Sequence, residues 1–348
     1  MTRIALPVAT AATAVALIAA GCGGGGTATV KGVTASAGGT VSTASSGSSY
    51  KVGLVTDIGG LNDHSFNHLA YLGLQHAGKA LGVQTRVLES HANSDYVPNM
   101  SSLAQQGYDL VIGVGFLMHD SIRAVAKKFP NTKFMIIDDA WSKGDPKNLE
   151  GTVFHEEQAG YMVGYLSGLM EKGAKTISSV GGQKIPPVDH YIAGYMAGAK
   201  AANPNITVLN GYSQDFVAQD KCKNLALQQI GQGSKVVFQV AGGCGLGALD
   251  AAKQKHVWGI GVDADQAYLG SHILTSAVKR VDNDVYTTAK QLVDGTLKTG
   301  RTYEFTVANG GIDIGKISSK VPQADVTKVE NLKKKIAAGS VTIPNTVP

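Results

Sequence analysis

The stretch DIGGLNDHSFN, residues 57–67, brings together side chains that could hold a small polar molecule. It follows the apolar run KVGLVT and therefore leaves the end of a predicted buried strand. Two glycines favour a turn, while Asp57 and Asn62 offer hydrogen-bonding groups. Phe66 can serve either as a hydrophobic staple into the core or as a stacking surface for a flat ligand. We interpret this loop as a binding site.

Other predicted strands also end in acidic, glycine or aromatic residues. Asp138 and Asp139 end the run FMIIDD, and Asp263 has the same kind of position in GVDADQ. A single aspartate at a strand end can simply form a turn or a helix cap. The carboxyl ends of parallel strands, however, face one crevice, where ligands bind in open α/β sheets. Phe66 and Phe216 have comparable places in the two halves of the chain, so two aromatic rings could close on a flat ligand.

The elements that must position these side chains alternate between strands and helices. From residue 50, apolar runs such as YDLVIGVG and KFMIIDD alternate with amphipathic segments such as SFNHLAYLGLQHAGKAL. Apolar runs without polar alternation are typical of parallel strands covered on both faces. The 348 residues exceed the usual size of one compact core. We therefore predict an α/β fold of two Rossmann-like, doubly wound parallel-sheet lobes.

Three chain crossings should join the lobes, near His155, Lys279 and Arg301. The expected lobes are residues 50–155 plus 280–302 for the first, and residues 156–279 plus 303–348 for the second. Such crossings would form a hinge beside a cleft between the lobes.

The N-terminus has the pattern of an exported lipoprotein. Residues 1–21 combine an early Arg3, an apolar stretch and small residues before Cys22, as a secretory leader does. The ending IAAGC is similar to a bacterial lipoprotein processing site and predicts lipidation of Cys22; the alternative is simple secretion with a chance cysteine. Residues 22–49 are rich in Gly, Ser and Thr, which predicts a flexible tether. We expect the folded body on the extracytoplasmic face of the bacterial cell membrane.

Composition narrows the function further. The net charge is +5, and no Lys/Arg cluster is interleaved with aromatic residues, so nucleic acid is not an expected partner. Cys222 and Cys244 can pair in an oxidising compartment or remain two free thiols. Two cysteines lack the number and spacing of a structural zinc site, and neither a metal nor a cofactor is predicted.

An extracytoplasmic enzyme, for example a nucleoside hydrolase, is the rival class. The sequence contains neither a Gly-x-Ser-x-Gly elbow nor a His-Glu-x-x-His zinc helix. The run GGCGLG matches a dinucleotide loop only weakly, because it lies late in the chain. His64, His119 and His155 lie near predicted strand ends, but none has an obvious nucleophile or orienting partner in sequence. We therefore predict no catalytic residues and no enzymatic activity.

Seven blocks of sequence resemble one family of bacterial receptors. They read VTDIGGLNDHSFN, YDLVIGVGFLM, FMIIDD, HEEQAGYMVGYLSGLM, AGGCGLGALDAAK, GIGVDADQ and LTSAVKR. In this order they resemble the basic membrane protein family over roughly residues 51–298. The resemblance implies a lipid-anchored substrate-binding component of an ABC importer, with the two-lobed fold of type I periplasmic binding proteins.

The resemblance also implies a ligand and partners. The ligand would be a purine nucleoside of the guanosine, inosine or adenosine type, and the partner would be an ABC permease that meets a monomeric receptor. The same trap could hold another small solute, such as a sugar. A signalling or adhesion protein acting without transport would share every one of these features.

The family's binding residues map onto Asp57, Asn62, Phe66, Asp138, Phe216, Gly242, Asp263 and Lys279. The resemblance implies that the two phenylalanines stack on the faces of the purine. It implies that Asp138, or its neighbour Asp139, bonds the edge of the base. Asp263 would accept hydrogen bonds from the ribose, and Lys279 would donate to it. The three remaining residues would complete the cradle by side chain and backbone.

Two cysteines depart from the family's pattern. Cys244 lies where the family more often has threonine or another small polar residue, and Cys222 lies early in the predicted helix after Phe216. Both lie beside proposed cleft elements of the second lobe, which favours a disulfide that stiffens this wall. The resemblance itself predicts no such bond.

Overall fold

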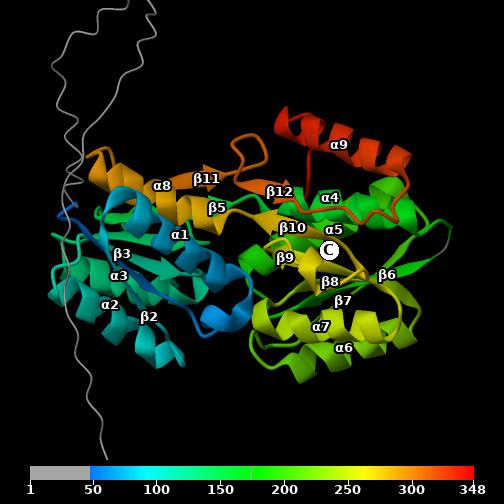
Figure 1. Ribbon diagram of the computed structural model, residues 1–348, viewed down its shortest axis with the longest axis horizontal. Helices are drawn as coiled ribbons and strands as arrows, with labels where there is room; N and C mark the ends of the chain where they lie inside the picture. The colour runs from blue at the N-terminus through cyan, green and yellow to red at the C-terminus, as the bar shows by residue number, and fades with distance from the viewer. Residues whose placement is uncertain (1–47, 174) are drawn as a thin grey trace, which may run out of the picture. The chain divides into compact units, whose positions relative to one another are not determined.

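The structure, a computed structural model, describes residues 48–173 and 175–348. The expected leader 1–21, Cys22 and nearly all of the tether 22–49 lie outside the described residues. The described body contains two six-stranded sheets with helices packed on them (Figure 1). The predicted α/β class with two parallel-sheet layers is confirmed.

The first sheet is parallel throughout. Its strands, in spatial order, are β11 (Arg301–Phe305), β5 (Leu149–Phe154), β4 (Lys133–Ile137), β3 (Leu110–Val114), β1 (Lys51–Val55) and β2 (Gln84–Leu88). All five neighbouring pairs are parallel, so every strand ends at the same edge. Asp57 and Asp138 follow β1 and β4 and therefore lie at this common carboxyl edge.

The second sheet repeats this arrangement with one antiparallel strand. Its order is β12 (Ile312–Ile314), β10 (Ile273–Lys279), β9 (Trp258–Asp263), β8 (Ser234–Val240), β6 (Thr176–Gly181) and β7 (Thr207–Tyr212). Only the pair β10–β12 in this sheet is antiparallel. The carboxyl edge of this sheet carries Asp263 and Lys279 as the last residues of β9 and β10.

Helices cover both faces of each sheet, as parallel strands require. They are α1 (Phe66–Leu81), α2 (Tyr96–Gln105), α3 (His119–Lys128), α4 (Glu156–Met170), α5 (Pro186–Ala202), α6 (Gln219–Gly231), α7 (Gly242–Gln254), α8 (Val281–Val293) and α9 (Gln323–Ala337). On the first sheet, Leu110 and Ile112 belong to the core shared with α1 and α8, whereas Val111 packs in a separate core with α2 and α3. Successive residues of β3 are buried on opposite faces of the sheet, which explains why its sequence is apolar throughout.

The chain passes between the sheets three times. It leaves the first sheet after β5, returns after β10 and leaves again after β11. The third crossing lies beyond Phe305, so the expected limit at residue 302 was three residues too early. The reason is that residues 303–305 continue to pair with residues 152–154 of β5. Residues 301–314 are thus divided between the two sheets.

The C-terminal part adds a helix that the sequence interpretation left out. The helix α9 packs against α4 on the second sheet (Figure 1). Its buried residues Val329, Leu332 and Ile336 follow the three-and-four spacing of an amphipathic helix. Among the helices of residues 48–173 and 175–348, none combines the length and the apolar character that a membrane crossing requires.

Candidate functional site

A cavity lies where the carboxyl edges of the two sheets meet, and the space between its walls is about 570 Å³ including the open mouth. Its lining includes seven of the predicted residues: Asp57, Phe66, Asp138, Phe216, Gly242, Asp263 and Lys279. These residues come from both sheets, so the fold brings together side chains up to 222 positions apart in the sequence.

Asn62 is the predicted residue that does not line this cavity. It is exposed in a short 3-10 turn, Leu61–Asp63. The neighbouring Asn67 is buried instead, and its Nδ2 donates to Asp57 Oδ1 at 2.8 Å and to Asp63 Oδ2 at 3.1 Å. The short turn directs Asn62 outward, whereas Asn67 lies on the first turn of α1 and points inward. The sequence did contain a signal for Asn67, because it directly follows the predicted site residue Phe66.

The loop carboxylates are held by backbone amides. Asp57 Oδ1 accepts from Gly59 N at 2.8 Å, and Asp63 accepts from the amides of Ser65, Asn67 and His68 at the start of α1. Burial raises the pKa of Asp57 to about 6, although the Asn67 hydrogen bond opposes this shift. Burial likewise raises the pKa of Asp63. The loop therefore presents buried carboxyl groups that ionise less readily than exposed aspartates.

Lys279 is the buried cation of this cavity. Its Nζ donates to both Asp138 oxygens at 2.9 and 2.8 Å and to Glu156 Oε1 at 3.2 Å. It also lies over the Phe66 ring, 4.8 Å from the centroid, and 5.6 Å from the Tyr191 centroid. Burial alone would lower the pKa of Lys279, but Asp138, Glu156 and other nearby carboxylates outweigh it and raise the pKa. The lysine is charged and fixed between the two sheets.

The two adjacent aspartates after β4 have different surroundings. Asp138 adopts a left-handed backbone (φ 68°) and lines the cavity, and burial raises its pKa to about 7 against the opposing charge of Lys279. Asp139 is turned toward α3, where His119 Nδ1 lies 2.7 Å and Arg123 Nη1 lies 2.5 Å from its Oδ2. Of the two candidates, Asp138 has the position from which a ligand in the cavity can be reached.

Asp263 links the two sheets directly. Ser65 Oγ, from the first half, donates to Asp263 Oδ2 at 2.8 Å, and Tyr191 OH from α5 donates to Oδ1 at 3.1 Å. Burial raises the pKa of Asp263, while Lys279 opposes the shift. Each carboxylate oxygen has a second lone pair, so Asp263 can still accept from a ligand. Sequence reasoning missed Tyr191, which has the apolar spacing of an ordinary core residue in α5.

The second-sheet wall contains Phe216, Gly242 and a disulfide. Cys222 and Cys244 are bonded, with their Cα atoms 5.6 Å apart, so the pairing alternative holds and the free-thiol alternative was wrong. The bond joins α6 to α7. Gly242 has φ 54° at the first position of α7, a backbone conformation that favours glycine.

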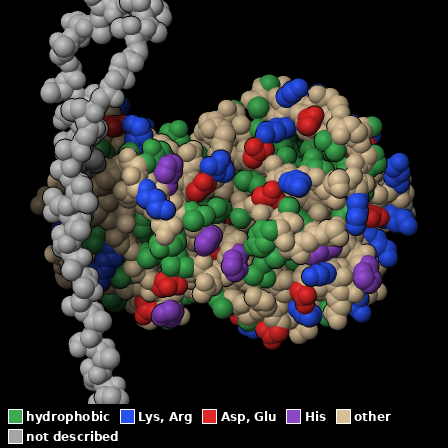
Figure 2. Space-filling view, in the orientation of Figure 1, with side chains coloured by type: hydrophobic (Ala, Val, Ile, Leu, Met, Phe, Trp, Pro, Cys, Tyr) green, Lys and Arg blue, Asp and Glu red, His purple; other side chains and the backbone are tan. Residues whose placement is uncertain are grey.

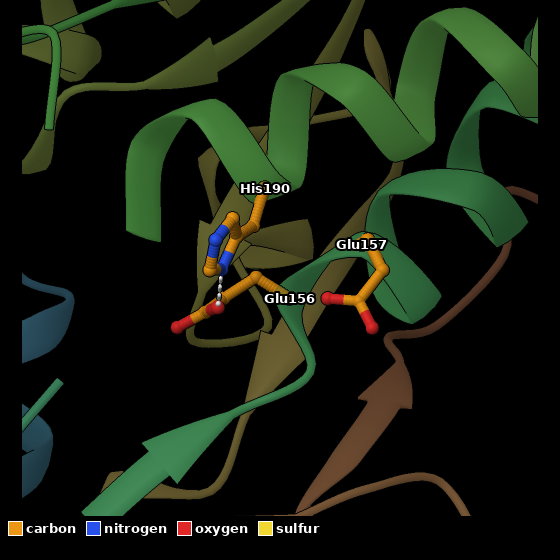
Figure 3. Close-up of side chains that lie close together, drawn as sticks. All are labelled: Glu156, Glu157 and His190. Atoms are coloured by element: carbon orange, nitrogen blue, oxygen red, sulfur yellow. Dashed lines mark hydrogen bonds and ion pairs between the residues drawn. The ribbon is translucent and has the colours of Figure 1, made fainter. Parts of the chain in front are cut away.

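One cluster beside the cavity has the composition of a metal site. Glu156, Glu157 and His190 each offer one ligand atom, all within 4.8 Å of one another (Figure 3). Glu156 Oε2 is already bonded to His190 Nδ1 at 3.1 Å, and its other oxygen holds Lys279. Glu157 Oε1 is bonded to His155 at 3.0 Å. The carboxylates thus have protein partners, and Glu156 joins His190 and Lys279 in one ion-pair network.

The three histidines considered as bases have other places in the fold. His64 is exposed, and His119 binds Asp139 on the α3 side. His155 bridges Glu157 and Glu304, and the Glu157 hydrogen bond raises its pKa to about 9 against the effect of burial. Within the described residues, none of the three lines the cavity between the sheets.

Comparisons with known proteins place this geometry in a family. The family model described as "ABC transporter substrate-binding protein PnrA-like" matches residues 50–347. The ABC transporter nucleoside-binding protein BmpA of Lactococcus lactis is 34% identical over 319 residues, covering 85% of this chain and 89% of that protein. An uncharacterized lipoprotein of Pyrococcus horikoshii is 36% identical over 299 residues, covering 82% of this chain and 71% of that protein.

Solved structures agree with this assignment at the level of the fold. An ABC transporter solute-binding protein of Aeropyrum pernix superposes with a TM-score of 0.78 at 24% identity, covering 86% of this chain and 94% of that one. A substrate-binding role implies a small ligand and a membrane permease as partner. The chain belongs to the basic membrane protein family of PnrA-like substrate-binding proteins of ABC transporters.

Proposed function

We propose that the protein is a lipid-anchored extracytoplasmic receptor that captures a purine nucleoside between its two sheets and delivers it to an ABC permease. The observation that carries this proposal is the pairing of Phe66 and Phe216, one from each half, in a cavity that also holds buried carboxylates and Lys279. A flat base suits the rings, and a ribose suits the charged groups. The printed name of the Lactococcus relative, a nucleoside-binding protein, supports this ligand class.

The anchor and location belong to the same proposal. Cys22 after a leader-like segment would carry the lipid, and residues 22–49 would tether the body. The Pyrococcus relative bears the name lipoprotein, which supports an anchored receptor. A single receptor body has the complete site, so we propose a monomer that meets its permease at the membrane.

Each polar group in the cavity has a proposed part in recognition. Asp138 accepts from the edge of the base, and Asp263 accepts from the ribose hydroxyls. Lys279, held by Asp138 and Glu156, donates to the same sugar. One face of the Phe66 ring already has this ammonium over it, so a base would stack on the opposite face. We propose that this arrangement captures the nucleoside without converting it.

Contacts to both halves couple binding to closure. Asp57, Phe66 and Asp138 lie at the carboxyl edge of the first sheet, whereas Phe216 and Asp263 lie at that of the second. A ligand that touches both sets has more contacts in the closed form. It therefore stabilises the closed form by the difference between its binding free energies to the two forms. The permease would then recognise the closed receptor.

Two single variants test the site. We expect Phe66→Ala and Asp263→Asn each to weaken inosine binding at least about tenfold, about 1.4 kcal/mol, because each removes a contact to a different part of the nucleoside. Isothermal titration gives the affinity, and the thermal unfolding midpoint controls for the fold. Unchanged affinity in both folded variants would show that the ligand does not bind in this cavity.

A further inference from the structure

The Cys222–Cys244 disulfide lies directly behind the proposed stacking residue Phe216. Both cysteines are fully buried, Cys222 in the first turn of α6 and Cys244 in the first turn of α7. Phe216 lies three residues before α6 begins, and Gly242 of the cavity lining is the first residue of α7. The bond therefore joins the two helix starts that flank the aromatic wall.

A hydrogen bond connects the disulfide to the backbone of Phe216. The amide of Cys244 donates to the carbonyl of Phe216 at 2.9 Å. The helices also approach closely at this end, because a Cβ on Gly247 would lie 1.9 Å from the carbonyl oxygen of Gln219. The position of Phe216 thus depends on how α7 sits against α6.

Contacts of Asp215 also hold this turn, although the adjacent Val217 is 54% exposed. The Asp215 side chain accepts from the amides of Val217 and Ala218 and pairs with Lys221 Nζ at 2.7 Å, and the Asp215 carbonyl accepts from Ser213 Oγ at 2.9 Å. On its inner side, the Phe216 ring lies against Gly182, where an added Cβ would be 2.3 Å from the ring. The ring fits against Gly182 only when the backbone of Phe216 stays in this position.

We infer that the disulfide is a ligand-positioning element that holds Phe216 at the cleft wall before the ligand arrives. The inference rests on the proposed function, since it assumes that Phe216 stacks on the base. Holding the ring in its bound position removes an ordering cost from the binding step. Loss of the bond therefore weakens the ligand through Phe216, beyond any general loss of stability.

A double-mutant cycle separates positioning from stability. The full chain carrying Cys222→Ala and Cys244→Ala is titrated with inosine in three backgrounds: wild type, Phe216→Leu and Phe66→Leu. We expect at least about fivefold weaker binding in the wild-type and Phe66→Leu backgrounds, and less than about twofold change in the Phe216→Leu background. An equal loss in the Phe216→Leu background overturns the inference, because the disulfide would then act independently of that ring.

A ligand-free measurement keeps this test distinct from that of the proposed function. Hydrogen exchange at the residue 244 amide should accelerate at least about tenfold in the double variant, while exchange in α4 and α5 stays unchanged. If no purine nucleoside binds the wild type, the proposed function falls, and the exchange result alone decides whether the bond holds Phe216. If the double variant does not fold, the folded wild type is reduced with a phosphine and used in its place. Thiol counting then confirms that the disulfide is broken. Unchanged exchange at residue 244 overturns the inference.

Discussion

At the scale of single residues, Lys279 connects groups that are far apart in the sequence. It pairs with Asp138 from the first half and with Glu156 at the first crossing, and its ammonium lies over Phe66. Removing one partner of a buried ion pair leaves an uncompensated charge, which is strongly destabilising. The cluster therefore fixes the relation of the two sheets as well as the chemistry of the cleft.

Glu150 allows a pH test of burial away from the cleft. It is 2% exposed on β5, and its Oε2 has no hydrogen-bond partner among residues 48–173 and 175–348. Burial raises its pKa from 4.5 to about 7, with Arg301 opposing. A raised carboxyl pKa means that the folded state binds more protons than the unfolded chain between these values. The free energy of unfolding therefore falls as the pH rises from about 4.5 through about 7, because Glu150 must then ionise in its buried place.

We expect Glu150→Gln to remove this pH dependence. Relative to wild type, the variant should gain up to about 3 kcal/mol in free energy of unfolding between pH 4 and pH 8. Urea unfolding at a series of pH values measures the difference. The control is Glu330→Gln, which changes an exposed carboxylate on α9 and should leave the difference flat. A variant that gains nothing at pH 8 would show that Glu150 ionises as easily as an exposed residue.

Seven of the eight site residues predicted from the sequence line the cavity, because strand ends of parallel sheets converge. It failed where a side chain's direction depends on local geometry. Asn62 and Asn67 are equivalent as residue types, and only the 3-10 turn before α1 decides which one is buried. Tyr191 gave no signal, since its hydroxyl reaches Asp263 only after α5 packs on the second sheet.

At the scale of elements, α4 and α5 pack with their backbones almost in contact. Added Cβ atoms on Gly160 and Gly164 of α4 would lie 2.1 Å from carbonyl oxygens of α5, and the same distance separates those on Gly194 and Gly198 from carbonyl oxygens of α4. Glu156 and His190 lie near the starts of these helices, so the close approach also brings the Lys279 network together.

We expect Gly164→Ala to destabilise the protein by about 2 kcal/mol, because the helices must separate to admit the methyl group. Alanine for glycine inside a helix is otherwise favourable by about 0.5–1 kcal/mol, so the sign is informative. Gly231→Ala at the end of α6 is the matched control, since a Cβ there meets no atom within 4 Å. Chemical unfolding of both variants gives the comparison. Stabilisation by Gly164→Ala would contradict the packing described here.

The sequence predicted helices and strands well where a regular apolar pattern ran over many residues. It predicted their ends poorly where tertiary contacts decide where an element begins or stops. Helix α6 begins at Gln219 rather than near Phe216, because the Asp215 side chain caps Val217 and Ala218 in a separate turn. Strands β11 and β12 are separated by only six residues, yet they pair in different sheets. Nothing in their local sequence distinguishes the two partners.

At the scale of the whole molecule, the repeated β-α units made the two-sheet fold predictable from sequence. Bonds such as Ser65 to Asp263 then join the two sheets across the cavity. On the face shown in Figure 2, basic and acidic side chains are interspersed over much of the surface.

The most direct test is calorimetric titration of the protein, unfolded and refolded to remove any bound ligand, with inosine, guanosine, adenosine, cytidine, uridine and free ribose. We expect one-to-one binding of purine nucleosides at micromolar affinity or better, since two stacking contacts contribute ~1–3 kcal/mol each. Pyrimidine nucleosides should bind at least about tenfold more weakly, a difference of about 1.4 kcal/mol. Chromatography should recover the nucleoside intact. Binding of free ribose without any purine nucleoside, or release of base and ribose, would contradict the nucleoside receptor.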